Sequence, residues 1–194
     1  MFNVGDKVVY PMHGAGTIVS IEEKEMLNDI NNYYIIKMPV DGMKLMVPTK
    51  NADAIGVREI SDKDISEQVY KVLEKPKEPY VHDANWSKRY HLNVEKIKSG
   101  DILEVAEVVR DLSHRHMERG LSIGEKNMLA KAKDILISEM VLSQDMSHDV
   151  IDNKIEEIIK ESYEAGLNTE MDSKGILNES DDNNDSGDNV IRLD

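Results

Sequence analysis

The chain has 194 residues, which is enough for one large domain or two small ones. Hydrophobic residues make up 40% of the sequence, but no apolar run approaches the ~18–20 residues that span a bilayer. Cysteine is absent, so disulfides and thiolate metal sites are excluded. The first residues lack the basic start and the apolar stretch of an export signal, and we therefore expect a cytoplasmic protein.

The formal net charge of −14 disfavours nucleic acid as a partner, because like charges repel. The charge is uneven along the chain, however. Residues 140–194 contain fifteen aspartates and glutamates against four lysines and arginines, whereas residues 86–139 contain nine against ten. This slightly basic segment also holds His91, His114 and His116. Weak contact with DNA is therefore compatible with residues 86–139.

Short runs of β-branched and aromatic residues, separated by breakers, predict five strands in the first sixty residues. Asp41-Gly42 is a strong hairpin signal, because glycine accepts a positive φ without steric cost. The expected strands are residues 7–10, 16–21, 33–38, 44–47 and 56–60. Five short strands in so few residues suit a small SH3- or Tudor-like β-barrel with an edge strand available for pairing.

From Ser61 onward the apolar residues recur with helical spacing, and Ser61 with Asp64 resembles a capping box. Residues 75–84 contain two prolines and few apolar groups and are predicted to form a linker. Helices are then expected at about residues 86–98, 101–119, 122–140 and 147–165, and Ser122 with Glu125 forms a second capping box. The short connections predict an antiparallel all-α bundle.

The expected fold class is therefore α+β with two domains. A barrel domain covers residues 1–60, a helix and linker cover 61–84, and a helical domain covers 85–166. Residues 167–194 are polar and acidic, and they carry too few apolar groups to offset the entropy of ordering, so we expect a disordered tail.

No catalytic constellation stands out, and we expect neither an enzyme nor a cofactor or metal site. His114 and His116 are two positions apart on a predicted helix, so they point to different sides and are expected on a solvated face. Gly14-Ala15-Gly16 lies between strands rather than before a helix, so it suits a tight backbone bend better than a phosphate site.

Trp86, the only tryptophan, opens a predicted helix directly after the linker. Its helical neighbours Tyr90, Val94 and Ile97 extend one apolar stripe, so spacing alone favours a buried indole. The alternative is a ring that protrudes to stack on a base or to enter a groove.

Basic side chains surround the same helix. Charged residues on a helix usually form its solvated face, but these lie beside Trp86 in the segment that is not net acidic. That position favours a functional role. The residues are Lys88, Arg89, His91, Lys96 and Lys98, together with Lys126 after the cap of a later helix.

Four motifs, in this order, resemble those of the CarD/CdnL family. Residues 4–16 (VGDKVVYPMHGAG) are similar to the start of that family and, more loosely, to the polymerase-binding module of transcription-repair coupling factor. Residues 85–90 (NWSKRY), 106–112 (AEVVRDL) and 118–126 (ERGLSIGEK) resemble its tryptophan motif and helical signature. The resemblance spans roughly residues 1–165, and its specificity comes from several motifs in the right order.

The resemblance implies a transcription regulator whose barrel binds the β subunit of RNA polymerase by strand addition. Lys24 and Met46 match positions that face polymerase. Met46 stands where some relatives carry arginine, so an apolar contact would replace an ion pair there.

The resemblance also implies that the helical domain lies on promoter DNA at the upstream edge of the melted region. Trp86 would enter the minor groove there and prolong the open complex. The residues that match backbone-facing positions are Lys88, Arg89, His91 and Lys126. His91 replaces a lysine or arginine, which weakens that phosphate contact at neutral pH.

Few basic residues displace few counterions, so the intrinsic DNA affinity is expected to be weak and to depend on delivery by polymerase. One alternative is an adaptor of RNA polymerase that has no direct DNA role and buries Trp86. Another is a small hydrolase that uses His13 or the other histidines.

Overall fold

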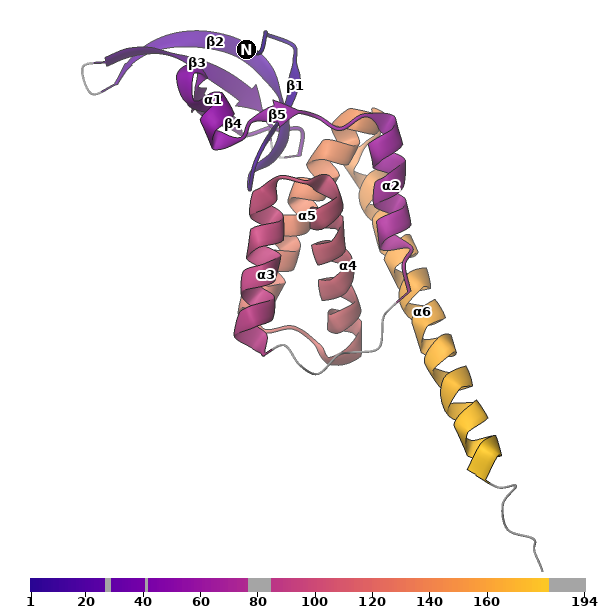
Figure 1. Ribbon diagram of the computed structural model, residues 1–194. Helices are drawn as coiled ribbons and strands as arrows, with labels where there is room; N and C mark the ends of the chain where they lie inside the picture. Colours follow the sequence, from indigo (N-terminus) through magenta and orange to yellow (C-terminus); the bar gives the residue numbers. More distant parts are fainter. Residues whose placement is uncertain (27–28, 41, 77–84, 182–194) are drawn as a thin grey trace, which may run out of the picture.

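A computed structural model describes residues 1–26, 29–40, 42–76 and 85–181. In this part of the chain an antiparallel sheet is followed by a bundle of helices, and the sheet sits at one end of the bundle (Figure 1). This arrangement confirms the expected α+β class.

The N-terminal sheet has five strands in the spatial order β4-β3-β2-β1-β5. The strands are β1 (Lys7–Tyr10), β2 (Gly14–Met26), β3 (Asp29–Lys37), β4 (Lys44–Pro48) and β5 (Arg58–Glu59). The short helices η1 (Thr49–Asn51) and α1 (Ala52–Ile55) connect β4 to β5. The end strands β4 and β5 are not paired with each other, so the expected barrel is open. β5 has only two residues, and the sheet ends before it can close.

β2 and β3 are longer than the sequence pattern predicts. Their ladder continues from the pair Glu22–Tyr33 to the pair Met26–Asp29, through mostly polar residues that the pattern does not mark as strand. Backbone hydrogen bonds need no apolar alternation, so such a hairpin can extend beyond the core. A register shift between Ile18 and Ser20 lies where β2 leaves the core, as bulges often do.

The sheet has its own small core beneath the bent strands. Tyr34 is central to it: its ring meets Phe2 edge-on at 5.9 Å, and its hydroxyl accepts a hydrogen bond from the Phe2 backbone N–H at 3.1 Å. The buried residues of this core are Val8, Ile18, Tyr34, Ile36, Met38, Val47, Ala52 and Val57.

Five helices build the bundle: α2 (Lys63–Leu73), α3 (Trp86–Ser99), α4 (Ile102–Arg119), α5 (Ile123–Gln144) and α6 (His148–Asp181). Capping side chains define their starts, because the first backbone N–H groups of a helix lack partners within it. Asn85, Asp101 and Ser122 cap α3, α4 and α5. The cap of α2 is Asp62, which accepts from the N–H of Ile65, so the expected start at Ser61 is wrong by one residue.

α2 belongs to the bundle rather than to a connection between domains. Its Val69, Tyr70 and Leu73 are buried in the same core as α4, α5 and α6. Most of the predicted linker, residues 77–84, lies outside the described residues.

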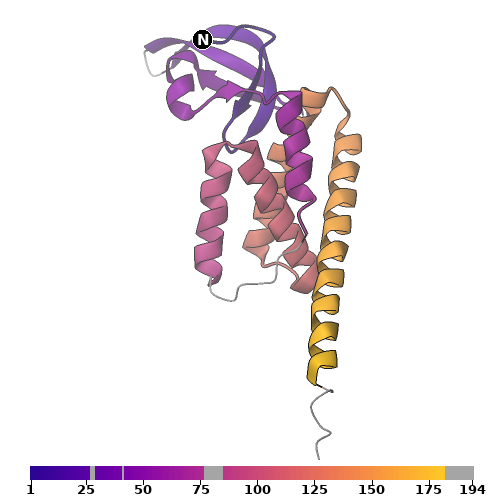
Figure 2. The ribbon, with the colours of Figure 1, turned by 45° about the vertical axis from the view of Figure 1, so that its right-hand side comes forward.

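α6 runs along the bundle and then past its lower end (Figure 2). It is continuous to Asp181, so the expectation of disorder from residue 167 is wrong for residues 167–181. Gly166 is still buried, whereas Met171 is 68% exposed. Adding turns to a helix already nucleated by packing costs little, which explains a helix that outlasts its apolar contacts. Residues 182–194 lie outside the described part.

His114 does not lie on a solvated face as expected. It is buried between α4 and α6, with Nε2 2.9 Å from the Ser162 hydroxyl. That hydroxyl donates to the carbonyl of Ile159, so His114 Nε2 is the donor to Ser162. His116, two residues on, is exposed as expected.

Within the described residues, no helix combines the length and the apolar character that crossing a membrane requires.

Candidate functional site

The N-termini of α3 and α5 meet at the end of the bundle that is remote from the sheet (Figure 1). The side-chain oxygen of Asn85 accepts from the N–H of Lys88 at 2.9 Å and so caps α3. The ring of Tyr90 packs on the first turn of α5, where a Cβ placed on Gly124 would lie 3.6 Å from it. Two helix N-termini, each with a partial positive charge, therefore lie side by side.

Trp86 stands on the first turn of α3 and is 49% exposed. One face of the indole stacks on Tyr90, with ring centroids 5.2 Å apart and planes 28° apart. The burial favoured by spacing alone is therefore wrong. The apolar stripe does enter the core further along, where Ile97 is buried, but its first residue lies beyond the neighbouring helices.

Glu125 ties the two helix starts together. Its carboxylate accepts hydrogen bonds from the N–H and the hydroxyl of Ser122 at 3.1 and 2.8 Å, which completes the capping box predicted from the sequence. Its other oxygen lies 3.4 Å from Arg115 Nε and 3.9 Å from Arg89 Nη2. Burial opposes the charged form, but the Ser122 hydrogen bonds and then the two arginines outweigh it and lower the pKa of Glu125.

Arg89 is consequently held against α5 rather than projecting freely into solvent. Arg115 of α4 joins it at the same carboxylate, a contact that the sequence analysis missed. The sequence holds only a weak signal for this contact. A buried capping-box glutamate needs cations nearby, but no sequence spacing shows which residues supply them.

The other basic residues of this end are exposed. Lys88 lies on the first turn of α3, and Lys126 lies on the first turn of α5. His91 Nδ1 lies 2.7 Å from the backbone carbonyl of Ser87 and donates to it, which leaves Nε2 available for a ligand.

The structure thus brings all five predicted DNA-facing residues to one end of the bundle. We call this end the helix-start surface; it comprises Trp86, Lys88, Arg89, His91, Ile123 and Lys126. Lys96 and Lys98 do not belong to it, because they lie near the other end of α3 and pair with Glu107 and Glu95.

The two predicted polymerase-facing residues lie on the sheet. Met46 is on β4 and is 43% exposed, and Lys24 is on the β2 extension, 3.1 Å from Glu22. Met46 pairs with Ile35, which pairs with Ser20, and Ser20 is four residues from Lys24 along β2. Because strand side chains alternate, Met46 and Lys24 share one face of the sheet. Among the described strands, none pairs with the outer edge of β4.

The sheet and the bundle are joined by buried polar contacts that no sequence motif predicts. Arg58 of β5 binds both carboxylate oxygens of Glu139 on α5, at 2.8 and 2.9 Å, and donates twice to the carbonyl of Gly100. Glu139 is 1% exposed and also accepts from the N–H of Ser61 at 2.8 Å. These contacts fix the sheet against the ends of α3 and α5.

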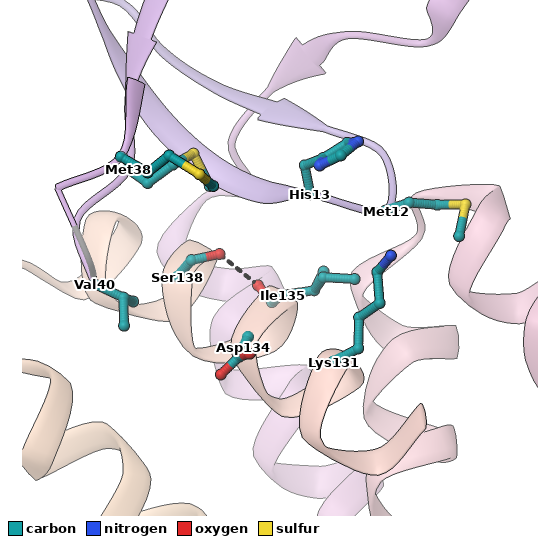
Figure 3. Close-up of a pocket in the computed structure, with 9 residues that line it drawn as sticks. Met12, His13, Met38, Val40, Lys131, Asp134, Ile135 and Ser138 are labelled. Atoms are coloured by element: carbon teal, nitrogen blue, oxygen red, sulfur yellow. Dashed lines mark hydrogen bonds between the residues drawn. The ribbon is translucent and has the colours of Figure 1, made fainter. Parts of the chain in front are cut away.

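Gly14 and Ala15 explain part of the N-terminal motif. The N–H of Ala15 donates to the Ser138 hydroxyl at 2.8 Å, and Ser138 in turn donates to the carbonyl of Ile135 (Figure 3). Gly14 has a φ of 97°, and a Cβ there would lie only 2.5 Å from Ser138 Oγ. Gly14-Ala15-Gly16 do not form a bend between strands as expected: they begin β2 and pair with β1, and only Gly14 has a positive φ. The absence of a side chain at Gly14 allows β2 to pack closely on α5.

A cavity of about 330 Å³ opens beside this contact, between the Met12–His13 turn and α5 (Figure 3). Burial, followed by the nearby charge of Lys131, lowers the pKa of His13. Across the described ranges no group of three or more histidines, aspartates and glutamates is placed to hold a metal ion.

Comparison with known proteins matches both halves of the chain. Residues 2–61 match the CarD-like/TRCF RID domain, and residues 68–156 match the CarD C-terminal domain. The Bacillus subtilis (strain 168) protein named "Putative transcription factor YdeB" is 41% identical over 140 residues, which cover 72% of this chain and 90% of that protein.

The first match ends just before α2, the second begins within it, and the C-terminal part of α6 lies beyond both. They point to a transcription factor rather than an enzyme. With both domains matched in order and a relative at this level of identity, the chain belongs to the CarD family of RNA polymerase-interacting transcription factors.

Proposed function

We propose that the protein binds the β subunit of RNA polymerase through the sheet and stabilises the promoter open complex through the helix-start surface. In this proposal Trp86 enters the minor groove at the upstream edge of the melted DNA. The single observation that carries it is the half-exposed indole, stacked on Tyr90 at the N-terminus of α3.

Charge supports DNA as the occupant of the helix-start surface. Lys88 and Lys126 are exposed on the first turns of two adjacent helices, where the helix dipoles also favour anions. Backbone phosphates would bind there and position the protein, and the indole would act on the bases or sugars between them.

The energies are of the right size. A tenfold longer open complex needs about 1.4 kcal/mol, and stacking of one base on an aromatic ring contributes about 1–3 kcal/mol. The overall charge of −14 makes free DNA binding weak. Delivery by polymerase offsets this weakness, because tethering raises the local concentration to the millimolar range for short linkers.

For the sheet, the outer edge of β4 and the face shared by Met46 and Lys24 support strand addition by the β subunit. A free edge offers unpaired backbone N–H and C=O groups, and Met46 adds apolar area beside them. The apolar contact stands in for an ion pair at this position.

The function is tested by open-complex lifetime in a competitor challenge with polymerase. Trp86→Ala should shorten the lifetime and leave polymerase binding unchanged. Leu92→Ala is the matched control, since Leu92 is 53% exposed on the same helix but outside the helix-start surface. Equal lifetimes for wild type and Trp86→Ala, with an intact fold, would contradict the wedge role.

Polymerase binding is tested separately. Met46→Glu in the full chain should lose affinity for the β subunit, while Val150→Glu, an exposed residue of α6, should not. If the Met46 variant loses polymerase while Trp86→Ala changes no lifetime, the protein acts as an adaptor without a direct DNA role.

A further inference from the structure

Ile123 is the most exposed apolar side chain of the helix-start surface. It is 81% exposed, against 49% for Trp86, and among the large apolar residues of the described chain only Met1 is more exposed. Single exposed apolar residues are common on protein surfaces, so exposure alone decides nothing. The position of Ile123 beside the other residues of the helix-start surface indicates a function for the exposed side chain.

Ile123 is the first residue of α5, directly after the Ser122 cap. Its neighbour Gly124 lies against Tyr90, and Tyr90 stacks on Trp86. Glu125, one residue further, holds Arg89 of α3. Through these contacts Ile123 and Trp86 occupy equivalent places, each opening one of two adjacent helices.

We propose that Ile123 is a second apolar wedge, which contacts the minor groove of promoter DNA beside Trp86. This inference rests on the proposed function and adds a residue to it. The family resemblance does not supply it, since Ile123 is not among the positions that the resemblance assigned to DNA.

The chemistry around Ile123 selects DNA as its partner. Lys126, on the same first turn of α5, and Lys88, on the first turn of α3, present cations on exposed positions. An apolar tip flanked by cations and helix N-termini suits a groove, where phosphates border the sugars and base edges. An apolar protein partner would not need the flanking positive charge.

The fold makes little use of the Ile123 side chain. Its side chain is largely in water, and the capping box of α5 is formed by Ser122 and Glu125 without it. Alanine is also the better helix former, so Ile123→Ala should leave the fold and its melting temperature intact.

The test compares Ile123→Ala with Val150→Ala in the full chain. Val150 is a matched control: it is β-branched, 52% exposed and in the first turn of α6, at the opposite end of the bundle. Ile123→Ala should shorten the open-complex lifetime about three- to tenfold, or roughly 0.7–1.4 kcal/mol. Polymerase affinity and melting temperature should not change, and Val150→Ala should behave as wild type.

A photo-crosslinking amino acid at position 123 identifies the partner directly. Crosslinks to promoter DNA in the polymerase complex support the inference, and crosslinks only to a polymerase subunit overturn it. If Trp86→Ala shortens the lifetime and Ile123→Ala does not, the inference fails while the proposed function stands. If neither variant shortens the lifetime, the proposed function itself fails.

Discussion

The guanidinium of Arg58 grips the carboxylate of Glu139 through two parallel hydrogen bonds, 81 residues apart in the chain. Arg58 also donates to the carbonyl of Gly100, which ends α3. A bidentate arginine–carboxylate pair is among the stronger polar contacts in proteins. Here it locks the last strand of the sheet to two helices of the bundle.

Breaking this pair should destabilise the protein. Glu139→Ala leaves the arginine without its partner, and we expect a loss of about 3 kcal/mol in the free energy of unfolding, near the lower end for buried pairs because Arg58 is partly exposed. Urea unfolding measures the loss. The double variant Arg58→Met/Glu139→Leu should recover much of it, and a double variant as unstable as Glu139→Ala would contradict the role of the unpaired charge.

Gly14→Ala should be costlier than the backbone conformation alone explains. Gly14 and Gly42 both have positive φ, 97° and 68°, but a Cβ on Gly42 meets nothing within 4 Å. Gly42→Ala should therefore cost about 1–2 kcal/mol for the left-handed backbone. Gly14→Ala should cost at least as much again, because its methyl group collides with Ser138, and thermal unfolding of the two variants compares them. Equal losses would show that the contact with Ser138 is not tight.

Because of Glu125, the glutamate of the α5 capping box, we expect the stability of the protein to depend on pH. The folded pKa of Glu125 lies below its usual value, so its charge stabilises the protein fully above the unfolded pKa near 4.5, and this stabilisation is lost as the pH falls through the folded pKa. Glu125→Gln keeps a capping partner but removes the charge.

The variant should therefore be less stable than wild type at pH 7, and the difference should shrink as the solution is acidified. Urea unfolding at several pH values measures it. A difference that stays constant down to pH 3 would show that the carboxylate charge contributes nothing.

Removing residues 168–194 should leave the bundle as stable as the full chain. Gly166 is the last residue of α6 described as buried, and Met171 beyond it is 68% exposed. The expected melting temperature of the truncated protein is within about 2 °C of wild type, since the side chains described beyond Leu167 are exposed and contribute almost no buried apolar area. A larger drop would mean that the extension of α6 contacts the rest of the molecule.

Local signals in the sequence predict most of the helix starts correctly, whereas contacts between residues far apart in the chain leave no signal in it. Ser122 and Glu125 are three residues apart, so their capping box could be predicted without knowing the fold. Arg58 and Glu139 carry no such signal, because nothing in either neighbourhood specifies a partner so far away.

Periodicity failed where a pattern continued beyond the packed region. The stripe that begins at Trp86 is apolar throughout, but only its later residues meet other helices. Conversely, the β2–β3 ladder continues from the pair Glu22–Tyr33 to the pair Met26–Asp29 without an apolar pattern, because backbone pairing alone sustains it. The spacing of the sequence places His114 in solvent, because it does not reveal a buried hydroxyl such as that of Ser162.

The hydrogen bonds from Arg58 to the carbonyl of Gly100 fix one end of α3 to the sheet, so the length of α3 sets the distance between the sheet and Trp86. The sheet is anchored at Gly100, the cap that directly follows α3, and Trp86 is the first residue of α3. The fourteen residues of the helix, about 21 Å at 1.5 Å each, therefore separate Trp86 from the anchor. The distance from a partner bound to the sheet to the Trp86 indole is therefore fixed. Deleting one helical turn from α3 would bring the indole about 5.4 Å closer to the sheet. The length of this helix therefore determines the separation of the two ends of the molecule.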